Sequence, residues 1–176
     1  MTSENQSSAP QSQSAALLEQ SMEMMQRDKI IFIDEEKEKL VIFSLASRLF
    51  AFYGRDLKEI IKYEDASWVP GMPDFFLGLI NLRGDIESVI DIGFLFGVEE
   101  AEKGWSHVLI TQNNGVRTGI VVDSIQDVVD IPVTALHPPL STLENRERDC
   151  IAQEFDYQEK RISLLNLSRI FDFTSL

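Results

Sequence analysis

Hydrophobic residues from Leu40 onward come in short runs that are separated by polar or glycine-containing breaks. Short runs rich in Val, Ile, Leu and Phe and bounded by turn residues are typical of β-strands. The run at 57–63 also fits a helical period, but its alternation favours a strand with Leu57, Glu59 and Ile61 on one face. The predicted strands cover residues 40–45, 49–53, 57–63, 77–82, 86–92, 107–111, 116–123, 125–131, 151–155 and 161–165.

The break between the runs 77–82 and 86–92 contains Arg83, Gly84 and Asp85. Two apolar runs around such a break predict a β-hairpin. Gly84 and Asp85 are the predicted central residues of a type II′ turn, because glycine takes the required positive φ at least cost. Arg83 then lies beside the tip in solvent, since a guanidinium is costly to bury. Taken alone, the stretch favours a solvated turn arginine over a binding residue.

The same order of runs and breaks occurs twice, with a period of about 70 residues. Each copy runs strand, turn, strand, strand, a proline-containing crossing, a hairpin and a short helix. Five short strands with Gly and Pro at the corners predict a small closed barrel, since closure removes exposed strand edges. The prediction is therefore a mainly β fold with two five-stranded barrels around a shared core, and it leaves open whether the copies exchange terminal strands or helices.

The first 38 residues form an N-terminal extension, and residues 39–176 are assigned to one domain. Residues 1–14 are rich in Ser and Gln and are expected to be disordered. Leu17, Leu18, Met22 and Met25 recur at helical spacing and predict an amphipathic helix at about 15–27, which docks either on its own domain or on a partner. The other predicted features are a helical turn at 75–77, helices at 91–96 and 167–173, and a polar loop at 141–148.

The chain is strongly acidic, with a net charge of -13 over 176 residues. Such a surface repels phosphate groups, so nucleic-acid binding and adhesion to an anionic membrane are not expected. No apolar run approaches the ~18 residues of a membrane-spanning helix, so we expect no membrane insertion. The single cysteine, Cys150, fits a reducing compartment, and we expect a cytoplasmic protein without a secretory signal.

Candidate catalytic groups do not form a recognisable constellation. The sequence has no phosphate-binding glycine loop and no Cys/His set at metal-ligand spacing, so we expect no cofactor and no metal. Asp91 and Asp123 each follow an apolar strand and could do acid–base chemistry if they converged, but both stand where a turn or a helix cap needs an acceptor. His107, His137 and Cys150 have no partner at useful spacing. The expected function is presentation of a surface rather than catalysis.

Several motifs in order resemble those of the CheW-like domains. The stretch from Val69 to Gly84 is similar to the family's central motif, followed by Val89 to Ile92, and the stretch from Gly119 to Val128 resembles its second signature. Leu57 to Ile60 and Leu164 to Leu167 are similar to its third strand and its last strand, so the likeness covers about residues 39–173. The resemblance implies two SH3-like barrels around a common core.

The resemblance also implies a function. CheW-like proteins are non-enzymatic adaptors that couple the cytoplasmic tips of methyl-accepting chemoreceptors to the regulatory domain of the histidine kinase CheA, in arrays at the inner face of the cytoplasmic membrane. The resemblance also allows contacts with further copies or paralogues of the protein in rings. An adaptor of a non-flagellar pathway, such as pilus motility, would share the core residues, and the extension is the only local feature that hints at a difference.

Family positions carry over onto six residues of this chain. The resemblance implies receptor binding by Arg83, with Leu57 and Val128 lining a groove for the receptor's helical tip. It implies kinase binding by Glu59, Ile60 and Gly78.

Two positions depart from the family pattern. Ser88 stands where proline is usual, and Tyr53 where a small acidic or amide residue is common, which alters the rim near it. A kinase regulatory fragment and a barrel that binds a small ligand are the rival functions.

Overall fold

The computed structural model describes residues 35–99, 104–140 and 145–174. The predicted amphipathic helix at 15–27 lies outside these ranges. The described part is mainly β, as predicted, and all ten predicted strands are found with ends shifted by a few residues. The strands are β1 (Lys37–Leu45), β2 (Arg48–Tyr53), β3 (Leu57–Lys62), β4 (Phe76–Leu82), β5 (Asp85–Ile90), β6 (His107–Asn113), β7 (Val116–Val122), β8 (Ser124–Pro132), β9 (Ile151–Tyr157) and β10 (Lys160–Leu165).

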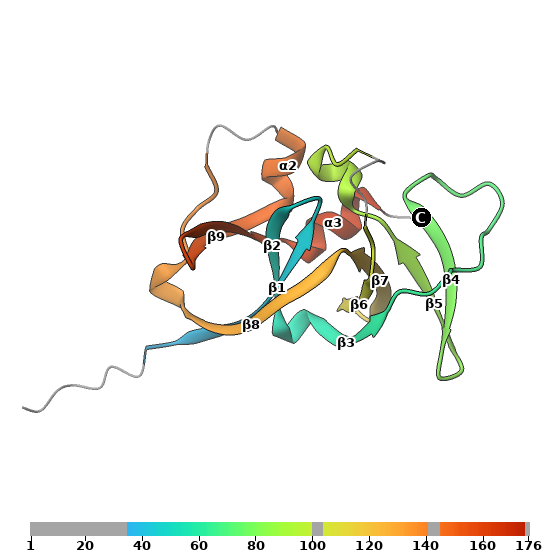
Figure 1. The fold of residues 1–176 in the computed structure, drawn as a ribbon, viewed down its shortest axis with the longest axis horizontal. Coiled ribbons are helices and arrows are strands. Elements are labelled where there is room, and N and C mark those ends of the chain that lie inside the picture. Colours follow the sequence, from blue (N-terminus) through green and yellow to red (C-terminus); the bar gives the residue numbers. More distant parts are fainter. Residues whose placement is uncertain (1–34, 100–103, 141–144, 175–176) are drawn as a thin grey trace, which may run out of the picture. The chain divides into compact units, whose positions relative to one another are not determined.

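The strands form two five-stranded sheets, and each sheet combines strands from both copies of the repeat (Figure 1). The first, sheet A, has the order β8-β1-β2-β10-β9, and the second, sheet B, has the order β3-β6-β7-β5-β4. The first hairpin of each copy therefore joins the last three strands of the other copy. This exchange was left open by the sequence and is complete in the structure.

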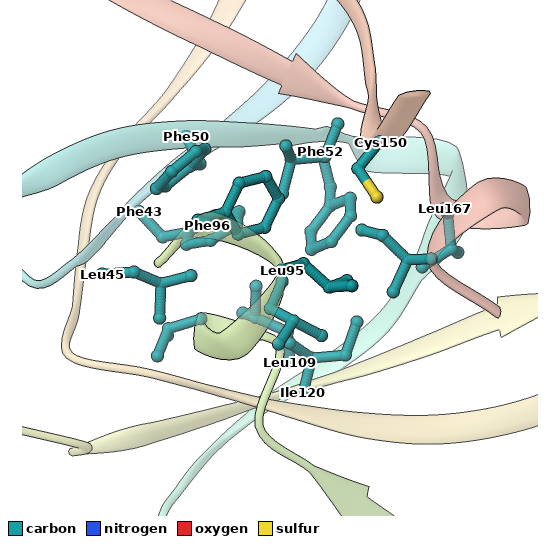
Figure 2. Packing of buried hydrophobic residues seen from close by; sticks show 14 of the residues in the cluster. Phe43, Leu45, Phe50, Phe52, Leu95, Phe96, Leu109, Ile120, Cys150 and Leu167 are labelled. Atoms are coloured by element: carbon teal, nitrogen blue, oxygen red, sulfur yellow. The ribbon is translucent and has the colours of Figure 1, made fainter. Parts of the chain in front are cut away.

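The two sheets share one large hydrophobic core (Figure 2). Sheet A contributes phenylalanines from β1 and β2, including Phe43 and Phe52, whose rings stack 5.2 Å apart. Sheet B contributes Leu109 and Ile120, and Cys150 is fully buried in the same cluster. Because side chains of both sheets interleave in this cluster, neither sheet buries its apolar face alone.

Each sheet also has a smaller cluster of its own on the other face. The cluster of sheet A contains Leu40, Phe155 and Ile162, and the cluster of sheet B contains Val89 and Val108. Strands β3 and β4 lie at the two ends of the sheet B order, and β8 and β9 at the two ends of sheet A. Within the described residues, no hydrogen-bonded ladder joins β3 to β4 or β8 to β9. Each sheet therefore has the five strands of an SH3-like barrel but is not closed by backbone hydrogen bonds.

The crossings and helices differ from the predictions in two places. Residues 75–77 hold a turn and the start of β4 rather than a helical turn, because Phe76 pairs with Ile90. The predicted polar loop at 141–148 contains the beginning of a helix, α2 (Asn145–Cys150). The predicted C-terminal helix is confirmed as α3 (Leu167–Phe173), where the Asn166 side chain accepts from the Arg169 N–H at 3.2 Å. Three short 3-10 helices complete the order: η1 (Gly54–Asp56), η2 (Gly93–Phe96) and η4 (Val133–Ala135).

The turn of the β4–β5 hairpin is not the predicted one. Leu82 pairs with Asp85, so Arg83 and Gly84 are the two central residues. Both have positive φ, 55° and 99°, which is the requirement of a type I′ turn. Asn81 supports this geometry because its Oδ1 accepts from the Gly84 N–H at 2.9 Å. Arg83 therefore lies at the tip itself and not beside it.

Candidate interaction surface

Arg83 projects from the β4–β5 tip and is the most exposed of the five predicted site residues other than Gly78. Its side chain is 78% accessible, and its Nη2 donates to Glu59 Oε1 of β3 at 2.6 Å. Since β3 and β4 are the end strands of sheet B, this ion pair spans the opening between them. The structure thus joins a residue predicted for receptor binding to one predicted for kinase binding, a pairing that the sequence did not indicate.

Strand β3 alternates from Glu59 onward, as the sequence predicted. The prediction that Leu57 shares a face with Glu59 and Ile61 is wrong, because a bulge between Leu57 and Glu59 turns Leu57 toward the shared core, whereas Ile61 packs against the small core of sheet B. Glu59 and Ile61 are half-buried, and Ile60 is 39% exposed on the other face. Ile60 lies opposite Leu109 of the shared core. An exposed isoleucine beside a buried leucine extends the core's apolar surface to solvent, which suits protein contact.

Gly78 has a structural role that the sequence did not reveal. The backbone of Ser67 pairs with Leu79 through two hydrogen bonds of 2.8 and 2.9 Å. A Cβ on Gly78 would lie 2.4 Å from the Ser67 carbonyl oxygen, and its φ is +143°. Only glycine allows this close approach, so Gly78 holds the crossing loop against β4 and presents no side chain to a partner.

Leu57 and Val128 come from different sheets but face the same core. Leu57 begins β3 and packs against the shared cluster. Val128 lies opposite Val41, which is on the same face of β1 as the core residue Phe43. Val128 is 50% exposed. The two side chains therefore border the shared core from sheet B and from sheet A.

The internal repeat relates Val128 to Ile60. The β1–β2 turn and the β6–β7 turn correspond, so Val41 corresponds to Leu109 in the ladders. Their opposite residues, Val128 and Ile60, are then equivalent in the two sheets. The predicted receptor residue and the predicted kinase residue thus occupy the same place in the two halves. Aligning the two copies by their turns would have revealed this equivalence from the sequence.

The rim around Tyr53, where the chain departs from the family pattern, lies on the small-core side of sheet A. The Arg55 guanidinium lies 3.8 Å from the centre of the Tyr53 ring and forms an ion pair with Glu38. The Tyr53 hydroxyl donates to Gln153 Oε1 at 3.1 Å, and partial burial raises its pKa. A stacked, hydrogen-bonded tyrosine makes this rim broader and more rigid than a small polar residue would.

The candidate acid–base residues act as turn acceptors. Asp91 Oδ1 accepts from the Gly93 N–H at 2.7 Å. Asp123 accepts from the N–H groups of Ala46 and Gly104 at 2.6 and 3.0 Å, so it stabilises the β1–β2 turn. Burial raises the pKa of the Cys150 thiol to about 11, which keeps it protonated and unreactive.

The described part of the chain has neither a metal-binding cluster nor a membrane-spanning helix. Its His, Cys, Asp and Glu residues form no group of three that could hold a metal ion. None of its helices is long and apolar enough to cross a membrane.

Comparisons with known proteins agree with this geometry. The family model of the CheW-like domain matches residues 39–174. A probable chemotaxis protein CheW of Rhizobium etli is 24% identical over 81% of this chain and 92% of its own length, and the chemotaxis protein CheW of Bacillus subtilis is 23% identical over 77% and 87%. The crystal structure of the scaffolding protein TtCheW from Thermoanaerobacter tengcongensis superposes with a TM-score of 0.70 at 29% identity, over 77% of this chain and 88% of that one. The chain therefore belongs to the CheW-like domain family, a family of chemotaxis adaptors and not of enzymes.

Proposed function

We propose that this protein is an adaptor that couples chemoreceptors to the histidine kinase CheA in signalling arrays. The observation that carries the proposal is the pairing of Arg83 with Glu59, which places a predicted receptor residue and a predicted kinase residue in direct contact on one exposed edge. An adaptor needs two partner surfaces close enough to be held by one rigid body, and the contact of Arg83 with Glu59 is where we propose that the two surfaces meet.

Receptor binding is assigned to Arg83, Leu57 and Val128. Leu57 and Val128 offer apolar anchors along the border of the shared core, and a helix with apolar residues at i, i+3 and i+4 fits such a border. Arg83 provides an exposed cation that fixes the orientation of the helix by pairing with an acidic receptor residue. The receptor tip therefore meets an apolar groove with one charged end.

Kinase binding is assigned to the segment of β3 that carries Glu59 on one face and Ile60 on the other, with Gly78 fixing the adjoining loop. Ile60 gives this segment an exposed apolar side chain, and Glu59 gives it a charge. A partner that packs a sheet edge or a loop against β3 would cover both side chains. Because CheA's regulatory domain has the same fold in this family, such a contact would join like domains.

The test is a bridging experiment with purified components. Membranes that contain a chemoreceptor are sedimented with the CheA regulatory domain, with and without this protein. We expect the kinase domain to sediment only when the adaptor is present. Equal sedimentation without the adaptor, or failure of the adaptor to bind either partner, would overturn the proposal.

As such an adaptor, the protein works in the cytoplasm, at receptor arrays on the membrane. A pulldown from the native cell, with the full chain and with a chain lacking residues 1–36, would name the pathway. Recovery of flagellar chemoreceptors supports a chemotaxis array, and recovery of pilus components supports the alternative adaptor role. A difference between the two chains would assign partner choice to the extension.

A further inference from the structure

The two sheets correspond strand by strand, so each is a reference for the packing of the other. The turn at Arg83 and Gly84 corresponds to the turn at Gln158 and Glu159, where φ is also positive at both residues. The bridge between Ser67 and Leu79 likewise corresponds to a bridge of His137 to Glu154. These matches fix which side chains should fill the concave face of each sheet.

At several corresponding places sheet B has smaller side chains than sheet A, although Tyr63 of sheet B is larger than its counterpart Ile131. Ile80 of sheet B is half-buried, and its counterpart in sheet A is the larger Phe155, which is 1% exposed. The other replacements follow from the same turns, ladders and bridges. Sheet B has Leu82 for Tyr157, Ala66 for Leu136 and Val108 for Leu40.

A cavity lies where these side chains are smaller. It has a volume of about 350 Å³ and lies between β3 and β4, with Ile61, Ile80, Leu82 and Val108 among its lining residues. In sheet A, Phe155 packs against Leu40 in the small core. The described residues leave this volume in sheet B unfilled, and the comparison with Phe155 indicates that an aromatic or branched apolar side chain would fit there.

The edge of the cavity offers backbone partners. Among the described residues, β3 forms a ladder with β6 alone, and β4 is held on its outer side by the single bridge to Ser67. An extended segment that enters between β3 and β4 could thus pair with strand edges while its side chains enter the cavity.

The rim of the cavity is acidic. Glu64 and Asp65 line it and are exposed, and they outnumber the one lining lysine, Lys62. Two exposed carboxylates are suited to a lysine or arginine side chain. Trp68 follows the lining residue Ser67 and is 72% exposed, so it can report on a ligand there.

We infer that the opening between β3 and β4 binds an extended peptide segment of a partner protein, in which an aromatic side chain fills the cavity and a neighbouring basic side chain meets Glu64 and Asp65. This inference does not rest on the receptor and kinase assignments. The Arg83–Glu59 pair lies at the turn end of the opening and bounds it there.

The test uses the full chain and a peptide derived from β9, whose Phe155 and Tyr157 fill the other sheet. The probe is the capped heptapeptide Ile-Ala-Gln-Lys-Phe-Lys-Tyr, which keeps the aromatic spacing and has lysine at both acidic positions. Binding is followed by Trp68 fluorescence and by amide chemical shifts. We expect saturable binding with a Kd below about 1 mM, with shifts at Ile61, Leu79 and Trp68.

Three comparisons locate the site. A peptide with alanine for both aromatic residues and the variant Leu82→Tyr, which fills the cavity, should each weaken binding at least about tenfold. Glu64→Lys should weaken it several-fold, while Glu159→Lys, an equal charge change on the exposed tip of the other hairpin, should not.

Absence of saturable binding to the wild-type chain, or shifts at another surface, would overturn the inference. The inference is also overturned if Glu64→Lys binds the peptide as tightly as the wild-type chain and the alanine peptide binds as tightly as the original one. These two measurements decide the matter even if Leu82→Tyr does not fold. Concentration-dependent shifts of Trp68 without peptide would mean that a second copy of the chain occupies the opening, and that result also overturns it.

Discussion

Arg83 Nη2 lies 2.6 Å from Glu59 Oε1, and this contact joins the tip of one hairpin to the strand at the far end of the same sheet. The arginine side chain is mostly in water, so the pair contributes at most about 1 kcal/mol to the free energy of unfolding. The pair matters for orientation rather than stability, because Glu59 restricts where the guanidinium points. A partner that binds Arg83 must compete with Glu59 or bind both side chains.

Arg83→Glu should weaken receptor association at least about tenfold because it replaces the exposed cation with a charge that repels both Glu59 and an acidic receptor residue. The free energy of unfolding should change by about 0.5 kcal/mol or less, as is usual for exposed sites. Receptor co-sedimentation and urea unfolding measure the two effects. Lys160→Glu, an equal charge change in the equivalent hairpin, is the control and should retain binding. Unfolding of the Arg83 variant would show that the arginine is structural.

Ile60→Glu and Val128→Glu form a matched pair because the two residues are equivalent in the two sheets and are both partly exposed. Ile60→Glu should reduce binding of the CheA regulatory domain and leave receptor binding intact. Val128→Glu should do the reverse. Each variant is the control for the other in separate binding assays. Loss of both partners in either variant would contradict the assignment of two distinct surfaces.

Gly78→Ala should destabilise the fold by about 2 kcal/mol or more, since it adds backbone strain and a clash with the Ser67 carbonyl. Gly84→Ala is the control, because Gly84 also has positive φ but its added Cβ would meet nothing within 4 Å. It should cost only about 1 kcal/mol. Urea unfolding of both variants separates the clash from the strain. Equal losses would mean that the loop moves away from β4 at little cost.

The buried Cys150 thiol should make stability depend on pH in the alkaline range. Burial raises its pKa from 9.0 to about 11, so the unfolded chain releases this proton first as the pH rises. The contribution is fully present below pH 9 and is lost between pH 9 and about 11, at about 1.4 kcal/mol per pH unit. The difference between wild type and Cys150→Ala in denaturant unfolding isolates this loss from that of other groups. A difference that is constant from pH 8 to 11 would contradict it.

Deletion of residues 1–29 should leave cooperative unfolding with a Tm within about 4 °C of the full chain. The reason is that the described domain holds its own first strand: the Glu36 carbonyl accepts from the Val133 N–H, and β1 pairs with both β2 and β8. Calorimetry measures the Tm and the cooperativity. A broad transition after deletion would show that the removed segment belongs to the folding unit.

Local patterns predicted the strands well because each is a short apolar run between turn residues. Asn114 and Gly115, a pair favoured in type I′ turns, lie between two such runs, and both have positive φ. The predicted turn was one position too late. Glycine is favoured at the first central residue of a type II′ turn and at the second central residue of a type I′ turn, so Gly84 alone fits both. The Asn81 side chain, which accepts from Gly84, decides between them. A single hydrogen bond from outside the turn was thus enough to change the result.

Contacts between distant residues were the part that the sequence could not give. The Arg83–Glu59 pair spans the two end strands of sheet B, and the close approach behind Gly78 depends on Ser67. Neither follows from periodicity, since periodicity reports a face and not a neighbour. The six site residues themselves came from the family resemblance, and the geometry adds how they are held.

The exchange of hairpins between the two copies has a consequence for synthesis on the ribosome. When the first copy, β1 to β5, has emerged, it contains two strands of sheet A and three of sheet B, so it cannot complete either. Both sheets wait for strands made much later, and the parallel pairing of β2 with β10 joins residues more than 100 positions apart. Such distant pairing slows folding and leaves apolar strand edges open meanwhile. The nascent first half is therefore the stage at which this protein most needs a chaperone.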